Sequence, residues 1–212
     1  FIDYTRALLG DEEYDKLAVA IQQEPPVSIR LNDGKLKIEN GKCRIVPQAG
    51  CITDFQLSAF NFEFNQVPWS SEGFYLDERL TFTFDPLFHA GCYYVQEASS
   101  MFVEQVLRQY VTGPVKMLDL CAAPGGKSTQ IAAAMKGEGL LICNEIHPAR
   151  AKILSENIER MGIKNALVLN ETPEQLAEHF PVCFDKIMVD APCSGEGMFR
   201  KNEEAGNEWS LD

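Results

Sequence analysis

The sequence predicts an α/β protein in which a parallel sheet follows a small α+β domain. From residue 113 onward, segments typical of strands and of helices alternate. Such alternation predicts parallel strands joined by right-handed crossovers. Residues 1–112 instead carry short strand-like segments between Asn, Asp and Gly turns. We therefore expect two domains, residues 1–112 and residues 113–212.

Short helices and strands are expected in the first domain. Apolar residues alternate with acidic residues in the segment 1–24, which is typical of short amphipathic helices that end before Pro25 and Pro26. A helix is expected over residues 96–110, with Thr112-Gly113-Pro114 at its end. Strands are expected at residues 27–31, 42–46 and 81–84.

Strands and helices alternate through the second domain. The expected strands are residues 115–120, 140–144, 166–169 and 186–189. The expected helices are residues 128–135, 148–161 and 174–179. Because the carboxyl ends of parallel strands meet at one edge of a sheet, the residues that follow these strands are candidates for a functional site.

A glycine-rich turn follows the first of these strands and opens a helix. It reads Cys121-Ala122-Ala123-Pro124-Gly125-Gly126-Lys127. A phosphate-binding loop, G-x-x-x-x-G-K-[ST], is disfavoured because Cys121 stands where its first glycine should. What remains is a turn whose glycines allow close approach to the backbone, at the positive end of a helix.

Acidic residues follow two further strands. Glu145 ends the strand after the turn, where an acid can bind the ribose hydroxyls of a nucleotide-like cofactor. The alternative is that Glu145 merely ends a strand. Asp190 and Cys193 follow the fourth strand and would reach the same edge. The pattern therefore predicts cofactor binding at one part of this edge and chemistry beside it.

Composition narrows the class of protein. With 212 residues, 45% of them hydrophobic, the chain can bury one substantial core and a second small one. No stretch approaches the roughly 20 apolar residues of a membrane span, and the first residues lack the pattern of a signal peptide. Seven cysteines without a C-x-x-C pair argue against zinc and for reduced thiols in the cytoplasm. A net charge of −12 offers no overall basic footprint for nucleic acid.

These residues together resemble the S-adenosylmethionine-dependent RNA (cytosine-5) methyltransferases of the Sun type. The resemblance rests on the glycine-rich turn, Asn144-Glu145, Arg150 and Asp190-Ala191-Pro192-Cys193-Ser194-Gly195-Glu196-Gly197. Upstream it covers Pro26-Val27-Ser28-Ile29-Arg30-Leu31-Asn32, Val67-Pro68-Trp69 and Tyr94-Val95-Gln96-Glu97-Ala98-Ser99-Ser100-Met101.

The resemblance implies a Rossmann-like methyltransferase sheet that binds S-adenosylmethionine, after an RNA-binding-like N-terminal domain. The three histidines share no ligand spacing, so no metal site is expected, and the oligomeric state stays open. Asn170 stands where the family often has an Asp that contacts adenine, and Thr172 is the alternative. The cofactor-binding residues carried over are Cys121, Ala122, Ala123, Pro124, Gly125, Gly126, Lys127, Glu145, Arg150, Asn170 and Asp190.

The resemblance also implies methyl transfer to carbon 5 of a cytosine in RNA, foremost ribosomal RNA. A thiolate first adds to carbon 6 of the base, which makes carbon 5 nucleophilic. Asp190 would face the base and Lys127 would offset the developing charge. Cys193 would assist product release, whereas in DNA cytosine-5 methyltransferases the Pro-Cys cysteine is the nucleophile. The sequence leaves both roles open for Cys193.

The family's sheet has seven strands, and its RNA enzymes take their nucleophile from a Thr-Cys motif beyond the fourth. Because only four candidate strands precede Asp212, we expect an N-terminal part of a longer protein that is inactive alone. One alternative, a methyltransferase for amino nitrogens, is disfavoured because such enzymes usually carry Asn/Asp-Pro-Pro-aromatic rather than Pro-Cys. Another is a non-catalytic RNA-binding or assembly module that retains the cofactor fold.

Overall fold

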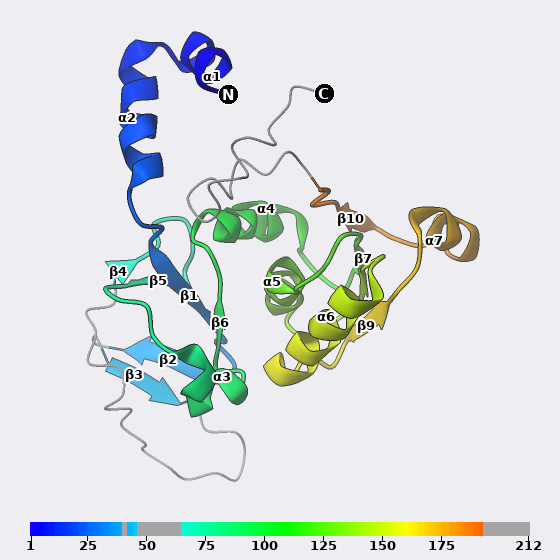
Figure 1. Ribbon diagram of the computed structural model, residues 1–212. Coiled ribbons are helices and arrows are strands. Elements are labelled where there is room, and N and C mark those ends of the chain that lie inside the picture. The colour runs from blue at the N-terminus through cyan, green and yellow to red at the C-terminus, as the bar shows by residue number, and fades with distance from the viewer. Residues whose placement is uncertain (40–41, 46–64, 193–212) are drawn as a thin grey trace. The chain divides into compact units, whose positions relative to one another are not determined.

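The computed structural model describes residues 1–39, 42–45 and 65–192 (Figure 1). Residues 27–190 form one compact unit, and residues 1–26 belong to another. In the latter, α1 (Ile2–Leu9) and α2 (Asp11–Gln22) are joined by Gly10, whose φ of 79° favours glycine. Both helices end before Pro25, which confirms the helices predicted in residues 1–24.

The first part of the larger unit contains an antiparallel sheet in the order β4-β5-β1-β6. Its strands are β1 (Val27–Leu31), β4 (Asn65–Gln66), β5 (Gly73–Leu76) and β6 (Tyr93–Val95). β1 lies between β5 and β6, and its Ile29 and Leu31 are buried in one cluster with Tyr93. β2 (Leu36–Glu39) pairs antiparallel with β3 (Lys42–Ile45). The strands predicted at 27–31 and 42–46 are confirmed.

The strand predicted at residues 81–84 is wrong. A 3₁₀ helix, η1 (Phe82–Phe84), lies there and leads into α3 (Pro86–His89). Asp85 starts α3 because its carboxylate accepts a hydrogen bond from the Leu87 amide at 2.9 Å. Phe84 is 85% exposed, so the alternation of Thr and Phe marks no buried strand face.

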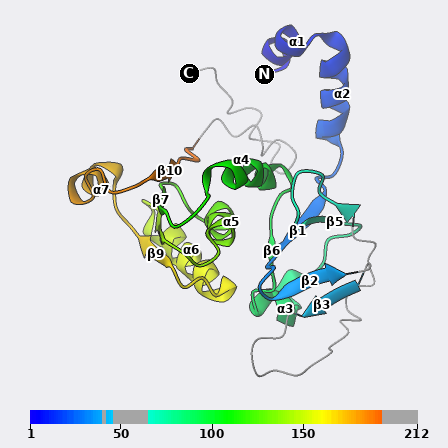
Figure 2. The ribbon, with the colours of Figure 1, turned by 180° about the vertical axis from the view of Figure 1, so that it is seen from behind.

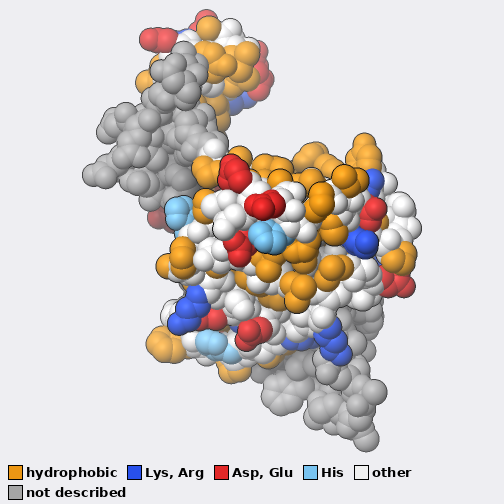
Figure 3. Space-filling view, turned by 90° about the vertical axis from the view of Figure 1, so that its right-hand side faces the viewer, with side chains coloured by type: hydrophobic (Ala, Val, Ile, Leu, Met, Phe, Trp, Pro, Cys, Tyr) orange, Lys and Arg blue, Asp and Glu red, His pale blue; other side chains and the backbone are white. Residues whose placement is uncertain are grey.

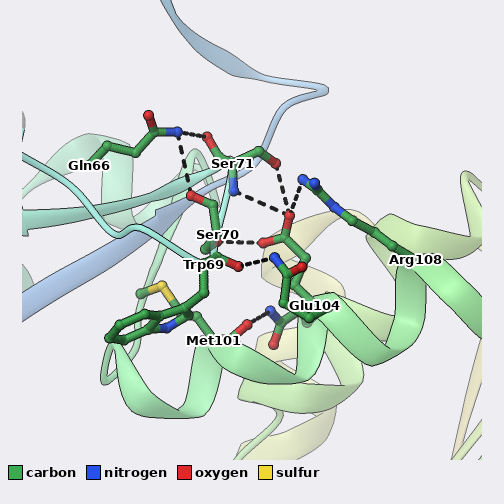
Figure 4. Close-up of polar contacts among 9 residues, drawn as sticks. Gln66, Trp69, Ser70, Ser71, Met101, Glu104 and Arg108 are labelled. Carbon is green, nitrogen blue, oxygen red and sulfur yellow. Dashed lines mark hydrogen bonds and ion pairs between the residues drawn. The ribbon is translucent and has the colours of Figure 1, made fainter.

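The helix predicted over residues 96–110 begins later than expected. A 3₁₀ turn, η2 (Ser99–Phe102), precedes α4 (Val103–Tyr110), and Gln96 lies outside both. Figure 4 shows how α4 fastens the segment that follows β4: Glu104 accepts hydrogen bonds from the Ser70 hydroxyl and from the amide and hydroxyl of Ser71. The Trp69 indole donates to the Ala98 carbonyl at 2.7 Å.

The second part of this unit is a parallel sheet in the order β10-β7-β8-β9. Its strands are β7 (Lys116–Asp119), β8 (Leu140–Asn144), β9 (Ala166–Leu169) and β10 (Lys186–Met188). The helices between them are α5 (Gly126–Met135), α6 (Pro148–Met161) and α7 (Pro173–His179). The predicted alternation of strand and helix is therefore confirmed.

Helices cover both faces of the parallel sheet (Figures 1 and 2). Ile131 of α5 and Leu154 of α6 are buried in one cluster with Leu141 of β8. Leu176 of α7 packs in a separate cluster with Leu118 of β7. The chain runs outward from β7 to β9 and then returns to place β10 on the other side of β7. The strand order thus reverses at β7, and ligands of such sheets bind beyond the carboxyl ends at this point.

Apolar side chains gather on the side of the molecule seen in Figure 3. Among the described residues of the parallel-sheet half, five large apolar residues are more than half exposed: Ile146, Leu167, Val182, Ile187 and Val189. β10 pairs with β7 alone among the strands that the structure describes. In the same described ranges, no helix has the length and apolar character needed to cross a bilayer.

Candidate cofactor and active site

The glycine-rich turn links the end of β7 to the start of α5. Gly125 caps α5 with φ of 113°, a left-handed conformation that side chains disfavour. A Cβ at this position would also approach Cδ1 of Leu154 to 3.2 Å. The backbone conformation at residue 125 therefore favours glycine, and a side chain there would also require Leu154 of α6 to shift.

Hydrogen bonds from three neighbouring elements hold the backbone of the turn. The Ala122 amide donates to the Asn144 carbonyl at 2.8 Å, at the end of β8. Nη2 of Arg150 donates to the Ala123 carbonyl at 2.8 Å. The Pro124 carbonyl accepts from Nδ2 of Asn157 at 2.9 Å and from the Tyr94 hydroxyl at 3.2 Å. The turn is thus held in one conformation before any ligand arrives.

Asp119 lies buried at the end of β7, with 1% of its surface exposed. Its Oδ2 accepts a hydrogen bond from the Ser128 hydroxyl at 2.7 Å, in the first turns of α5. Its Oδ1 is buried without a hydrogen-bond partner among the described residues. Burial raises the pKa of Asp119 to about 6. The bond to Ser128 supports the simple interpretation that Asp119 orients the turn.

Glu145 follows β8 and is also buried, with 2% of its surface exposed. Its Oε1 accepts a hydrogen bond from the His147 amide at 3.0 Å, and Nη1 of Arg150 lies 3.4 Å from its Oε2. Arg150 therefore joins Glu145 to the Ala123 carbonyl of the turn. The structure brings these two predicted binding residues together at the edge where the sequence places them.

Lys127 and Asp190 form an ion pair in which Nζ lies 2.6 Å from Oδ2. Lys127 comes from the first turn of α5, and Asp190 lies just beyond β10. The Asp190 side chain is 54% exposed and that of Lys127 is 24% exposed. Burial, and after it the nearby acids Glu145 and Asp119, raise the pKa of the Cys121 thiol, so Cys121 stays protonated at neutral pH.

A cavity of about 180 Å³ lies beside this ion pair. The sequence predicts one side of it: Cys121, Ala122, Ala123, Pro124, Gly126, Lys127 and Asp190. The other side comes from the first part of the chain: Tyr94, Val95, Gln96, Glu97 and Ser100. Two larger cavities, of about 420 and 310 Å³, lie around Arg30 and contain none of the predicted site residues. The ion pair and the glycine-rich turn meet at the smaller cavity.

Four described residues of the predicted site do not line that cavity: Gly125, Glu145, Arg150 and Asn170. Asn170 uses its side-chain amide to donate to the carbonyls of Glu145 and Ile146, at 2.6 and 2.9 Å. The Thr172 side chain caps α7 together with Gln175. Contact of either residue with adenine stays a prediction. Cys193 lies outside the described residues, so its role stays a prediction as well.

The strand-order reversal, the glycine turn and the acids after β8 and β10 define the class of Rossmann-like methyltransferases. A solved methyltransferase homologue from Pyrococcus horikoshii shares this structure with a TM-score of 0.70 and 29% identity, over 91% of this chain and 59% of that one. NSun6 from the same organism, solved with SFG, has the same fold, with a TM-score of 0.62 and 19% identity over 91% of this chain and 70% of that one.

The family follows from the sequence matches. The model for the 16S rRNA methyltransferase RsmB/F matches residues 111–209, and that for the N-terminal domain of 16S rRNA methyltransferase RsmF matches residues 1–98. The chain belongs to the RsmB/F methyltransferase family, which confirms the resemblance to Sun-type enzymes.

Curated relatives share the sequence over its whole length. Ribosomal RNA small subunit methyltransferase F of Serratia proteamaculans is 35% identical over 99% of this chain. That of Pectobacterium atrosepticum is 39% identical over 100% of it. The chain spans 42% of the length of each of these relatives.

Proposed function

We propose that the whole protein transfers a methyl group from S-adenosylmethionine to carbon 5 of a cytosine in small-subunit ribosomal RNA, in the cytoplasm. The observation that carries this proposal is the ion pair of Lys127 and Asp190, beside a cavity next to the glycine-rich turn. Nζ of Lys127 lies 2.6 Å from Oδ2 of Asp190. Relatives named for methylation of small-subunit ribosomal RNA support the choice of substrate.

The residues at the turn fit a cofactor of this kind. Glu145 offers a buried carboxylate for ribose hydroxyls, and Gly125 keeps the turn free of a side chain. The unpartnered Oδ1 of Asp119 is a buried acceptor that lacks a donor among the described residues. When bound, S-adenosylmethionine supplies an electrophilic methyl group on a sulfonium.

Asp190 and Lys127 have the properties that the chemistry on the base requires. Asp190 exposes half of its carboxylate side chain at the cavity, where it can face N3 and the amino group of a cytosine. The ammonium of Lys127 can offset the negative charge that develops when a thiolate adds to the ring. Because both groups are already in place, little rearrangement is needed when charge appears.

The proposal is tested on the full-length parent protein with radiolabelled S-adenosylmethionine and small ribosomal subunits that lack the modification. Digestion of the RNA to nucleosides should place the label in 5-methylcytidine. Lys127→Met should cut the rate about 100-fold or more, because it removes a preorganised charge. Lys116→Met, an exposed lysine at the start of β7, should leave the rate unchanged. Label in another nucleoside, or none despite cofactor binding, would contradict the proposal.

A further inference from the structure

Two of the sequence segments that carry the family resemblance meet in the antiparallel sheet. One contains Ser28 and Arg30 on β1, and the other contains Gln96 after β6. The Ser28 hydroxyl donates to the Gln96 carbonyl at 2.6 Å. Nε of Arg30 donates to Oε1 of Gln96 at 2.8 Å. The two segments thus form one buried polar group.

This polar group reaches the helix that starts at the glycine turn. Nη2 of Arg30 donates to the Thr129 hydroxyl at 2.6 Å and to the Gly126 carbonyl at 3.4 Å. The Thr129 hydroxyl also donates to the Gly126 carbonyl, at 3.0 Å. Nε2 of Gln96 donates to Oε1 of Gln130 at 3.3 Å. A side chain of the antiparallel sheet therefore contacts the first turn of α5 directly.

The charge on Arg30 makes this contact costly. Arg30 has 3% of its surface exposed, and it forms no ion pair with any residue that the structure describes. Burial lowers its pKa to about 10, so it is still charged at neutral pH. A positive charge is also disfavoured near the N-terminus of a helix. Burying a charge that has no ion partner costs free energy, which favours a role for Arg30 beyond stability.

The turn of α5 that Arg30 contacts is part of the candidate site. Gly126 and Lys127 line the cavity beside Asp190. No side chain caps the helix at its start, because the N-cap residue is Gly125. Arg30 does not replace such a cap, because it donates to the Gly126 carbonyl and the Thr129 hydroxyl rather than accepting from a free amide, but it ties the first turn to the antiparallel sheet.

We propose that Arg30 is a positioning residue: from the antiparallel sheet it holds the first turn of α5 in the conformation that binds the cofactor. This inference rests on the proposed function. It makes the first part of the chain a determinant of cofactor affinity, in addition to any contact that this part makes with RNA.

The test compares variants at two cationic side chains, Arg30 and Lys35, of the full-length parent protein. Lys35 donates from Nζ to the carbonyls of Ala90 and Arg160, so it also bridges the two parts of the unit, but away from α5. In calorimetric titration with S-adenosylmethionine, the dissociation constant of Arg30→Met should be about tenfold or more above that of wild type, the usual effect of losing a charged hydrogen bond. Lys35→Met should bind within twofold of wild type, although its melting temperature without cofactor also falls.

Thr129 provides a second pair of variants, in case Arg30→Met does not fold. Thr129→Val removes the acceptor and should weaken cofactor binding, whereas Thr129→Ser keeps the hydroxyl and should retain wild-type affinity. The combination of Arg30→Met with Thr129→Val should bind no more weakly than Arg30→Met alone, because both remove the same contact.

The outcomes separate this inference from the proposed function. Failure of the wild-type protein to bind S-adenosylmethionine would overturn the proposed function. Tight binding by wild type together with equal binding by Arg30→Met and Thr129→Val would overturn the positioning role and leave the proposed function intact. Equal losses of affinity in Arg30→Met and Lys35→Met would show that Arg30 acts only on overall stability, which also overturns the inference.

Discussion

Glu145 and Asp190 follow different strands of one sheet, β8 and β10, yet their surroundings differ sharply. The Glu145 side chain is 3% exposed and is held by Arg150 and by the His147 amide. The Asp190 side chain is 54% exposed and has the Lys127 ammonium as its partner. A buried, fixed carboxylate suits the binding of a constant group such as a ribose. An open carboxylate beside a cation suits chemistry on a base that enters and leaves.

The largest expected effect concerns the rate at the open acid. Asp190→Asn in the full-length parent protein should reduce methyl transfer about 100-fold or more, because a preorganised charge is removed. Its affinity for S-adenosylmethionine should stay within a few-fold of wild type. The matched control is Asp185→Asn, at the other end of β10, where the carboxylate accepts a hydrogen bond from the Lys116 amide. Equal activity of wild type and Asp190→Asn on small ribosomal subunits would remove Asp190 from the chemistry.

At the buried acid, the expected effect is on binding. Glu145→Gln should weaken the affinity for S-adenosylmethionine by about 1.5–3 kcal/mol, the contribution of a charged hydrogen bond. Glu156→Gln, an exposed acid on α6, should not change it. Calorimetry measures both dissociation constants. Unchanged affinity of Glu145→Gln would mean that this acid merely ends its strand.

A third acid, Asp119, should make stability depend on pH. Its pKa, raised by burial to about 6, lies above the value of about 3.9 in an unfolded chain. The native state therefore binds the proton more tightly, so this contribution to stability is full below about pH 4 and is lost as pH rises through about 6. In urea unfolding, Asp119→Asn should lack the pH-dependent change in unfolding free energy, on the order of 3 kcal/mol, that Asp119 gives the wild type. An identical pH profile in both proteins would contradict the raised pKa.

The smallest expected effect is on stability and comes from Glu104, away from the strand edge. The pKa of Glu104 is shifted in the opposite direction from that of Asp119. Burial opposes its ionisation, but the hydrogen bonds from Ser70 and Ser71 outweigh that effect and lower the pKa of Glu104. Its contribution is present above about pH 4.3 and is lost as pH falls. Glu104→Gln should cost about 1 kcal/mol of unfolding free energy at pH 7 and leave cofactor affinity unchanged. A change in affinity would place α4 within the site.

Local patterns were sufficient to predict the parallel sheet and most of one side of the cavity. The turn from Cys121 to Lys127 and the acid Glu145 lie next to their strands in the sequence, so spacing alone indicates where they meet. The prediction for residues 81–84 was wrong because alternation of Thr and Phe occurs both in strands and in exposed 3₁₀ turns. Pro86, which begins α3, is the residue that favours the helical turn here.

The other side of the cavity depends on tertiary structure. Tyr94 and Gln96 reach it only because β6 pairs with β1 and because Arg30 then contacts α5. The short strands β5 and β6 carry no strong alternation, so the sequence does not predict them. The sequence signal that could have indicated this side of the cavity is the segment from Tyr94 to Met101, a long and specific match to the family. No function was known for that segment, so the sequence alone did not place it at the cavity.

Amide hydrogen exchange of the full-length parent protein, with and without S-adenosylmethionine, tests most directly the claim that the cofactor binds at the edge of β7 and β8. The account predicts that the cofactor slows exchange in residues 119–129 and 144–147 and leaves β4 and β5 unchanged. Slowed exchange around the larger cavities at Lys136 and Lys164, with no change in the turn, would contradict it.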